Sequence, residues 1–367
     1  MSTVLTNRII KIIKDLGPIT FAQYMRLALY DPIDGFYGGG KVKIDPHEGK
    51  GDFSTHPEVS SPHFGGSIAS LASRIHSEHP LSYIIVLGDG NGTLSSDMMD
   101  YLKKLNPELY NSVSLEAVDI SLPLLKKQKQ KLESRGHSAN FHNISAVEFP
   151  FGDFSNALVI ANELIDNFPG HRLIKTRNGF TEFYVTLKNG QLTMRAGPLS
   201  DDAAMFVERA RAMGRSLEDI DIAEDDVIAN PNLIRLMDGL SRSKSIGFLT
   251  VDYGSYRYSN SSIRIYSEGT RLNFGPLISP GDVDITYGVD FQVLLGAASF
   301  DSRFYCENSR LFLNRIHWDR DFNGFPDYLH RDLTLRIKPQ NVAFVARGMT
   351  IPNLEKFLGD ANMLEKG

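Results

Sequence analysis

Short apolar runs and amphipathic stretches alternate through the middle of the chain. The run SYIIVL at 82–87 is rich in β-branched residues and ends at a glycine, and the apolar residues of 94–105 then recur at helical spacing. The run at 113–118 and the amphipathic stretch 122–132 repeat this order. Because strands that alternate with helices form parallel sheets, the pattern predicts an α/β fold. Further strands are predicted at 157–161 and 246–251, and the segments 291–298, 303–306, 310–316 and 342–346 are expected to supply the last helices and strands of the sheet.

Two segments do not follow this alternation. Helical spacing over residues 1–80 predicts an N-terminal helical cap, and residues 81–367 then form the domain that contains the sheet. About 80 residues separate the fourth and fifth predicted strands, far more than the dozen or so that a crossover helix needs. Alternating residues with Asn-Gly turns, followed by a helical stretch, predict an α+β insertion over 170–245.

A glycine-rich loop follows the first strand of the predicted sheet. In LGDGNGTL at 87–94, Gly88, Gly90 and Gly92 lie between a strand and a helix, where glycines allow positive φ and the free N–H groups of the helix attract negative charge. A dinucleotide-binding loop needs glycine or alanine where this chain has Thr93. The G-x-G-x-G spacing is instead usual in proteins that bind S-adenosylmethionine, although glycines also occur in such turns for tight packing alone.

An acidic residue ends the second strand of the predicted sheet. Asp119, followed by Ile120, lies where a carboxylate can accept hydrogen bonds from both ribose hydroxyls of an adenosine. An acid at this position is shared by NAD and S-adenosylmethionine sites. Asp119 therefore predicts a bound nucleoside without choosing between the two cofactors.

Composition and charge exclude several classes of protein. The 367 residues are 42% hydrophobic and 23% charged, as in an ordinary globular protein. The net charge of −5 lacks the basic excess of a nucleic-acid binder, and no run of about 18 apolar residues predicts a membrane-spanning helix. Because Cys306 is the one cysteine, we expect a reducing compartment and a cytoplasmic location. The ten histidines show no metal-binding spacing.

Several stretches along nearly the whole chain carry a family resemblance. The most specific are GPITFAQYMRLALYDPIDGFY at 17–37, GDFSTHPEVS at 51–60 and GTRLNFGPLISPGDVDITYGVDF at 269–291, and ANELIDNFP at 161–169 and VDYGSY at 251–256 add to them. With these motifs the chain resembles the MidA-like class of S-adenosylmethionine-dependent methyltransferases. That class includes a mitochondrial complex I assembly factor that methylates an arginine of a partner subunit.

The resemblance implies a fold, a cofactor and an acceptor. The fold would be the class I methyltransferase fold, a Rossmann-like seven-stranded sheet, with S-adenosylmethionine as cofactor and an arginine side chain of a partner protein as acceptor. The chain departs from the family at Val86, where glutamate is usual, and at Asp89, where proline is usual. It also lacks the common histidine around Asn273. We expect the carboxylate of Asp89 to attract the ammonium group of the cofactor instead.

Polar residues at the end of the fourth strand are candidates for catalysis. Asn162, Glu163 and Asp166 follow the run ALVIA, and ligands bind at the carboxyl ends of parallel strands. Carboxylates pair bidentately with a guanidinium group, so we expect Glu163 and Asp166 to orient the acceptor while Asn162 fixes the acceptor or the cofactor. The alternative is that both acids only begin and cap a helix, as acidic residues often do.

Further polar residues lie in the family-specific segments. Asp52, Thr55 and Glu58 are expected to close over the cofactor, with a simple helix entry as the alternative. Asp284 could face the acceptor groove, and Asp290 is interpreted as the N-cap of a helix that starts at Phe291.

Together these features predict a methyltransferase, and the resemblance implies an arginine of a partner protein as its acceptor. The alternatives are a methyltransferase for a small molecule and a catalytically silent assembly chaperone that binds its partner through the insertion at 170–245. Thr93 argues against an NAD-dependent dehydrogenase. We expect no nucleic acid and no membrane insertion, with a homodimer left open.

Overall fold

The computed structural model describes residues 4–45, 51–215, 217, 226–256, 263–273, 275, 277–297, 300–306 and 340–349. Residues 310–316, expected among the last helices and strands of the sheet, lie outside these ranges, as do residues 216 and 218–225 of the insertion. No helix in the described ranges is long and apolar enough to cross a membrane.

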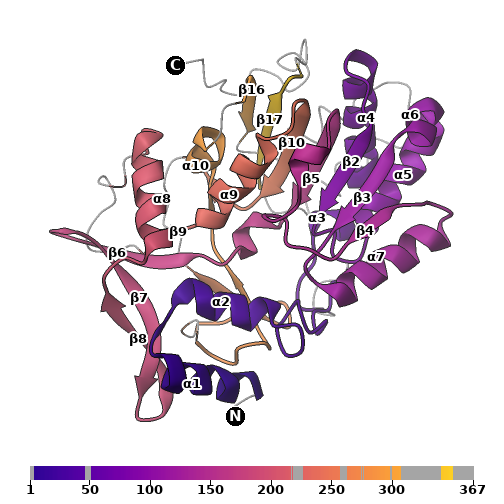
Figure 1. Cartoon of the computed structure of the whole chain (residues 1–367). Helices are drawn as coiled ribbons and strands as arrows, with labels where there is room; N and C mark the ends of the chain where they lie inside the picture. Colours follow the sequence, from indigo (N-terminus) through magenta and orange to yellow (C-terminus); the bar gives the residue numbers. More distant parts are fainter. Residues whose placement is uncertain are drawn as a thin grey trace.

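A seven-stranded sheet forms the centre of the fold and has the order β16-β17-β10-β5-β2-β3-β4. Neighbouring strands from β10 to β4 are parallel, and β17 runs antiparallel to both β10 and β16. This mostly parallel sheet, visible in Figure 1, confirms the predicted class I fold. The strands are β2 (Tyr83–Leu87), β3 (Ser114–Val118), β4 (Asn140–His142), β5 (Ala157–Asn162), β10 (Ile246–Asp252), β16 (Ser302–Cys306) and β17 (Asn341–Arg347).

Side chains alternate between the two faces of this sheet, and each face has its own core. Ile84 and Val86 of β2 pack with α4 (His63–Glu78) and α5 (Thr93–Leu105). Ile85 and Leu87 belong to the core of the opposite face, which also contains residues of α8 (Asp201–Ala212), α9 (Pro231–Leu240) and α10 (Phe291–Gly296). The helix at 63–78 thus belongs to a layer of the central sheet.

A third core joins the N-terminal segment to the insertion. It contains the buried faces of α1 (Val4–Leu16) and α2 (Phe21–Tyr30) together with Val185. Between the helices, β1 (Ile19–Thr20) pairs with β7, and Thr20 and Gln23 form a capping box at the start of α2. In Figure 1, α1 and α2 lie below the central sheet and next to β7.

The insertion forms the antiparallel hairpins that its Asn-Gly turns predict. In this second sheet the order is β1-β7-β6-β9, with β8 paired to β7. The strands are β6 (His171–Thr176), β7 (Gly179–Lys188), β8 (Gln191–Gly197) and β9 (Asp226–Ala229). Two smaller sheets consist of β12 (Arg264–Ser267), β13 (Thr270–Arg271) and β14 (Asp284–Thr286), and of β11 (Gly254–Ser255) and β15 (Val289–Asp290). The remaining elements are α3 (His56–Val59), α6 (Pro107–Ser112), α7 (Leu122–Ser134), η1 (Phe151–Asp153) and η2 (Ile165–Asn167).

The glycines at 38–40 form a compact turn. A Cβ atom on Gly38 would lie 2.4 Å from the carbonyl oxygen of Asp31. Gly40 has a φ of +70°, and its Cβ would lie 2.6 Å from the side chain of Pro123 in α7. These glycines therefore allow the turn to pack closely against two other segments.

Candidate functional site

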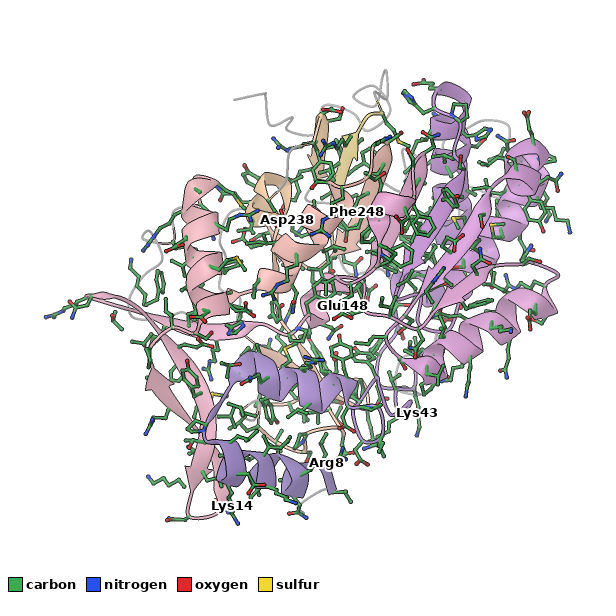
Figure 2. All side chains as sticks on the ribbon, viewed as in Figure 1. Arg8, Lys14, Lys43, Glu148, Asp238 and Phe248 are labelled. Carbon is green, nitrogen blue, oxygen red and sulfur yellow. The ribbon has the colours of Figure 1, made fainter. Side chains whose placement is uncertain are left out.

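A cavity of about 1920 Å³ lies at the carboxyl ends of β2, β3 and β5. Its walls come from the central sheet, from α2, from the 51–59 segment, from the insertion and from the small sheet of β12 and β14. Glu148, labelled in Figure 2, is one of the lining residues, whereas the labelled Phe248 lies in the core of the sheet. The cavity is lined by all the predicted site residues except Gly92: Asp52, Thr55, Glu58, Gly88, Asp89, Gly90, Thr93, Asp119, Ile120, Asn162, Glu163 and Asp166.

The glycine loop has the backbone that its sequence predicts. Gly88, Gly90 and Gly92 have φ values of +64°, +54° and +82°, in the left-handed region that favours glycine. Gly92 is the N-cap residue of α5, and a Cβ on it would lie 2.8 Å from the Cα of Gln128. Gly92 therefore packs against α7, whereas Gly88 and Gly90 line the cavity.

Asp89 fills a structural position within the loop as well as lining the cavity. Its Oδ2 accepts a hydrogen bond from the backbone N–H of Ser95 at 3.0 Å, near the start of α5. Burial raises the pKa of Asp89 to about 7, against the lowering effects of this bond and of Lys131. Val86, the other departure from the family pattern, is buried in the core beneath α4 and α5. Val86 thus packs in this core and does not line the cavity.

Asp119 lies one strand away from the glycine loop and holds its own turn in place. Its Oδ1 accepts from the N–H of Ser121 at 2.8 Å, and its Oδ2 accepts from Nε2 of Gln128 at 2.8 Å. Burial raises the pKa of Asp119 to about 6. The neighbouring Ile120 is 42% exposed although it is apolar. A carboxylate beside an open apolar side chain suits the sugar and base of a nucleoside.

The 51–59 segment closes one side of the cavity. Oε1 of Glu58 accepts from Oγ1 of Thr93 at 2.7 Å and from Nδ2 of Asn91 at 3.1 Å, so this residue holds the glycine loop from the outside. Asp52 accepts from the N–H of Lys43 at 2.8 Å. Thr55 is the N-cap residue of α3, but its side chain makes no capping bond. The segment is thus both a helix entry and a wall of the cavity.

Glu163 and Asp166 lie beyond β5, where acceptor binding is predicted. Glu163 has a φ of +48°, and its Oε1 accepts from the N–H of His56 at 2.9 Å. Oδ2 of Asp166 accepts from Oγ1 of Thr286 at 2.6 Å. Because these bonds join distant segments, neither acid simply caps a helix. Burial raises the pKa of Glu163 to about 7 and that of Asp166 to about 6.

Two buried polar atoms beside these carboxylates have no hydrogen-bond partner within the described ranges. They are Oδ1 of Asp166 and Oδ1 of Asn162, and both residues line the cavity. Buried acceptor oxygens without donors carry a free-energy cost of about 1–3 kcal/mol each. A ligand that brings N–H donors into the cavity would satisfy them.

Several acidic and phenolic side chains at this end were not among the predicted catalytic residues. Asp252 ends β10 and accepts from the N–H groups of Ile165 at 2.9 Å and Tyr253 at 2.8 Å. Its position at the end of a parallel strand is the same signal that pointed to Asp119. Tyr37 donates to Oδ1 of Asp284 at 3.0 Å. The sequence carried no pattern that could have joined these two residues. Asp290 is the N-cap residue of α10, as interpreted from the sequence.

The small sheet faces the cavity with its polar side. Arg264 pairs in register with Thr286, and Tyr266 pairs with Asp284, so that all four side chains share one face and line the cavity. Ile265 and Ile285 of the same strands point to the opposite face and into the third core. The charge of Arg264 lowers the pKa of Asp166 against the effect of burial. No group of acidic, histidine or cysteine side chains in the described part of the chain could hold a metal ion.

Comparisons with known proteins identify relatives of this chain. Residues 68–306 match the family described as "Putative S-adenosyl-L-methionine-dependent methyltransferase". The protein arginine methyltransferase NDUFAF7, mitochondrial, of Mus musculus is 28% identical over 305 residues, which cover 77% of this chain and 66% of that protein. The protein of the same name from Xenopus tropicalis is 28% identical and covers 80% of this chain and 70% of its own length. The chain thus spans about two thirds of the length of these curated relatives.

A solved structure shares the fold. A crystal structure of a "likely methyl transferase" from Burkholderia thailandensis, bound to S-adenosyl-homocysteine, superposes with a TM-score of 0.77 at 21% identity. The superposition covers 95% of this chain and 93% of that chain. The family description agrees with S-adenosylmethionine as the predicted cofactor.

One prediction is contradicted by these relatives. The curated proteins are named as mitochondrial, so the expectation of a cytoplasmic location is wrong. A single cysteine is compatible with any reducing compartment and cannot distinguish between them.

Proposed function

The chain belongs to this family of S-adenosyl-L-methionine-dependent methyltransferases, and on that premise we propose that its methyl acceptor is an arginine side chain of a partner protein. The observation that carries the proposal is the pair of carboxylates, the half-buried Glu163 and the buried Asp166, in the same cavity as the glycine loop and Asp119. A guanidinium group is a fork of N–H donors that stays charged at neutral pH, and carboxylates are its best partners. The relatives named as protein arginine methyltransferases support the same acceptor.

The part of the cavity lined by Gly88, Asp89, Gly90, Asp119 and Ile120, called here the cofactor half, suits S-adenosylmethionine. The buried carboxylate of Asp119 would accept from the ribose hydroxyls, Ile120 would contact the base, and Gly88 and Gly90 would let the backbone approach the methionine part. Asp89 and Glu58 line this part of the cavity, where an ionised carboxylate would attract the cationic end of the cofactor. The cofactor supplies an activated methyl group on a sulfonium centre, so the protein mainly has to align the acceptor.

The part of the cavity lined by Asn162, Glu163, Asp166 and Asp284, called here the acceptor half, would hold and deprotonate the guanidinium group. Asp166 Oδ1 has no donor among the described residues, so it can accept an N–H of the incoming arginine. Glu163 keeps its backbone partner His56 through Oε1. As a nitrogen of the arginine gains the methyl group it must lose a proton, and Glu163, with a pKa raised to about 7 by burial, is the stronger of the two bases.

The extent of the cavity favours a protein acceptor over a small molecule. Beyond Asp166 the cavity continues along Phe168 and His171 to the start of α8 at Asp201 and to Arg235 of α9. Ligand pockets for small molecules usually measure about 300–1,000 Å³, so the cavity of about 1920 Å³ leaves room for a polypeptide segment that carries the arginine. The insertion would then contact the partner protein beside the methylated residue.

The proposal is tested by following the methyl group. The protein is incubated with methyl-labelled S-adenosylmethionine and a cell lysate, the labelled protein is isolated, and its acid hydrolysate is separated into amino acids. We expect label in methylarginine. Label in another amino acid or in a small molecule would refute the arginine acceptor. A silent assembly chaperone would give no label and need not bind S-adenosylhomocysteine in calorimetry.

A further inference from the structure

A chain of hydrogen bonds connects the two halves of the cavity through Tyr37. The carboxylate of Asp119 accepts from the N–H of Ser121 at 2.8 Å. Oγ of Ser121 donates to the carbonyl oxygen of Tyr37 at 2.6 Å. The hydroxyl of Tyr37 then donates to Oδ1 of Asp284 at 3.0 Å. One residue of the N-terminal segment thus contacts both the turn that carries Asp119 and a carboxylate of the acceptor half.

Close packing holds Tyr37 in this position. Its ring stacks on Tyr30, with ring centroids 5.8 Å apart, and meets the edge of Phe36 at 5.0 Å. Three residues later, Gly40 packs so closely on Pro123 that a Cβ there would lie 2.6 Å from the proline side chain. Pro123 lies in the first turn of α7, which begins three residues after Asp119. The segment 37–40 therefore contacts the residues after Asp119 at two points, Ser121 and Pro123.

Asp284 has the environment of a third carboxylate for the acceptor. It is 6% exposed and lines the cavity. Both Tyr37 and Nδ2 of Asn167 donate to its Oδ1, the latter at 2.9 Å, which leaves Oδ2 outside these two bonds. Burial and the charge of Asp166 raise the pKa of Asp284 to about 7, while the bonds from Tyr37 and Asn167 lower it. Tyr37 therefore favours the ionised form, which a guanidinium group needs.

We propose that Tyr37 is a positioning residue that makes cofactor binding at Asp119 and acceptor binding at Asp284 cooperative. A nucleoside bound to Asp119 would fix the position of the Ser121 backbone, and the bond from Ser121 to the carbonyl oxygen of Tyr37 would pass this constraint to the residue that holds Asp284. An acceptor that binds afterwards would then meet a carboxylate already held in place, which is positive coupling. The inference rests on the proposed function, because it takes the acceptor to be a guanidinium group.

Calorimetry on three proteins tests the coupling. N-acetyl-L-arginine amide is titrated into the wild type, Tyr37→Phe and Tyr24→Phe, each with and without saturating S-adenosylhomocysteine, and N-acetyl-L-citrulline amide serves as the uncharged control probe. Tyr24 is a matched control because it is buried in α2 and its hydroxyl has no hydrogen-bond partner among the described residues. A coupling free energy of typical size makes the arginine probe bind about fivefold tighter or better to the loaded protein.

We expect S-adenosylhomocysteine to raise affinity for the arginine probe about fivefold or more in wild type and Tyr24→Phe, and under about twofold in Tyr37→Phe. Affinity for S-adenosylhomocysteine alone should be unchanged in both variants. Equal affinity for the arginine probe with and without S-adenosylhomocysteine in wild type would overturn the coupling and leave the acceptor class standing. An unchanged gain in Tyr37→Phe would exclude Tyr37 as the link. No preference for the arginine probe over the citrulline probe would overturn the proposed acceptor and this inference with it.

A pH series on the loaded proteins adds a reading that a merely structural role would not change. Asp284 faces Tyr37, Asn167 and Asp166, and its register partner on β12 is Tyr266, next to Arg264. Loss of the Tyr37 hydroxyl removes a bond that lowers the pKa of Asp284, so Asp284 becomes protonated at a higher pH in Tyr37→Phe. As pH is lowered, affinity for the arginine probe should therefore start to fall at a higher pH in Tyr37→Phe than in wild type. In Asp284→Asn this dependence should weaken and probe affinity should drop, while binding of S-adenosylhomocysteine persists. Superimposable pH curves for wild type and Tyr37→Phe would contradict the role of Tyr37.

Discussion

Replacement of Glu163 by glutamine tests the acceptor half of the cavity. Oε1 of Glu163 accepts from the N–H of His56 at 2.9 Å, and the amide oxygen of glutamine can keep that bond. The fold of the 51–59 segment should therefore survive. What the variant loses is the negative charge and the base, and its amide N–H₂ group points donors at a guanidinium that also carries only donors.

The expected size of the effect follows from the burial of this site. Removing one partner of a buried ion pair costs about 3–5 kcal/mol, and each 1.36 kcal/mol is a factor of ten. We therefore expect kcat/KM for methyl transfer to fall by about two to four orders of magnitude. Affinity for S-adenosylhomocysteine should stay within a few fold, because Asp119 and the glycine loop are untouched.

The assay compares Glu163→Gln with wild type and with a matched variant, Glu116→Gln. Glu116 is 2% exposed and bonds Ser114, Asn140 and His142, but it does not line the cavity. Its replacement should lower the free energy of unfolding without changing turnover per folded molecule. Initial rates of transfer from labelled S-adenosylmethionine and calorimetry with S-adenosylhomocysteine give both quantities. Turnover of Glu163→Gln at the wild-type rate would remove Glu163 from the mechanism.

Three further predictions concern the cofactor, the pH dependence and the stability of the fold. Asp119→Asn should weaken binding of S-adenosylhomocysteine about ten- to 150-fold, since charge-assisted hydrogen bonds contribute about 1.5–3 kcal/mol; unchanged affinity in calorimetry would place the ribose elsewhere. Burial raises the pKa of Glu163 and of Asp284 to about 7, so both acids are protonated below that pH. We therefore expect kcat/KM to rise as pH increases through about 7. A flat profile between pH 5.5 and 8.5 would argue against ionised carboxylates as acceptor ligands. Tyr24→Phe removes a buried hydroxyl that has no partner in the described ranges, so the free energy of unfolding should rise by about 1 kcal/mol, and a lower Tm than wild type in calorimetry would indicate a hidden partner.

Much of the central sheet and the cofactor half of the cavity could be predicted from local sequence. The strand at 83–87 is a β-branched run, and its side chains alternate between two buried faces, so period and length together reveal it. Gly88 to Gly92 and Asp119 follow strands that lie side by side in a parallel sheet, so topology alone brings them together. The hairpins of the insertion follow from their Asn-Gly turns.

What the sequence could not reveal depends on contacts between distant segments. Tyr37 and Asp284 are 247 residues apart in the chain, and their hydrogen bond exists only because the N-terminal segment packs on the small sheet. Composition alone also does not show that the missing side chains of Gly38 and Gly40 allow close packing on Asp31 and Pro123. Gly92 likewise belongs to a helix contact with Gln128 and does not line the cavity.

The most direct test of the account is a crystal structure of the protein with S-adenosylhomocysteine. We expect the ribose hydroxyls to donate to Asp119 and the sulfur to face the carboxylates of Glu163 and Asp166, with the glycine loop along the homocysteine part. A ligand bound elsewhere, or with its sulfur directed away from Glu163 and Asp166, would contradict the assignment of methyl transfer to this cavity.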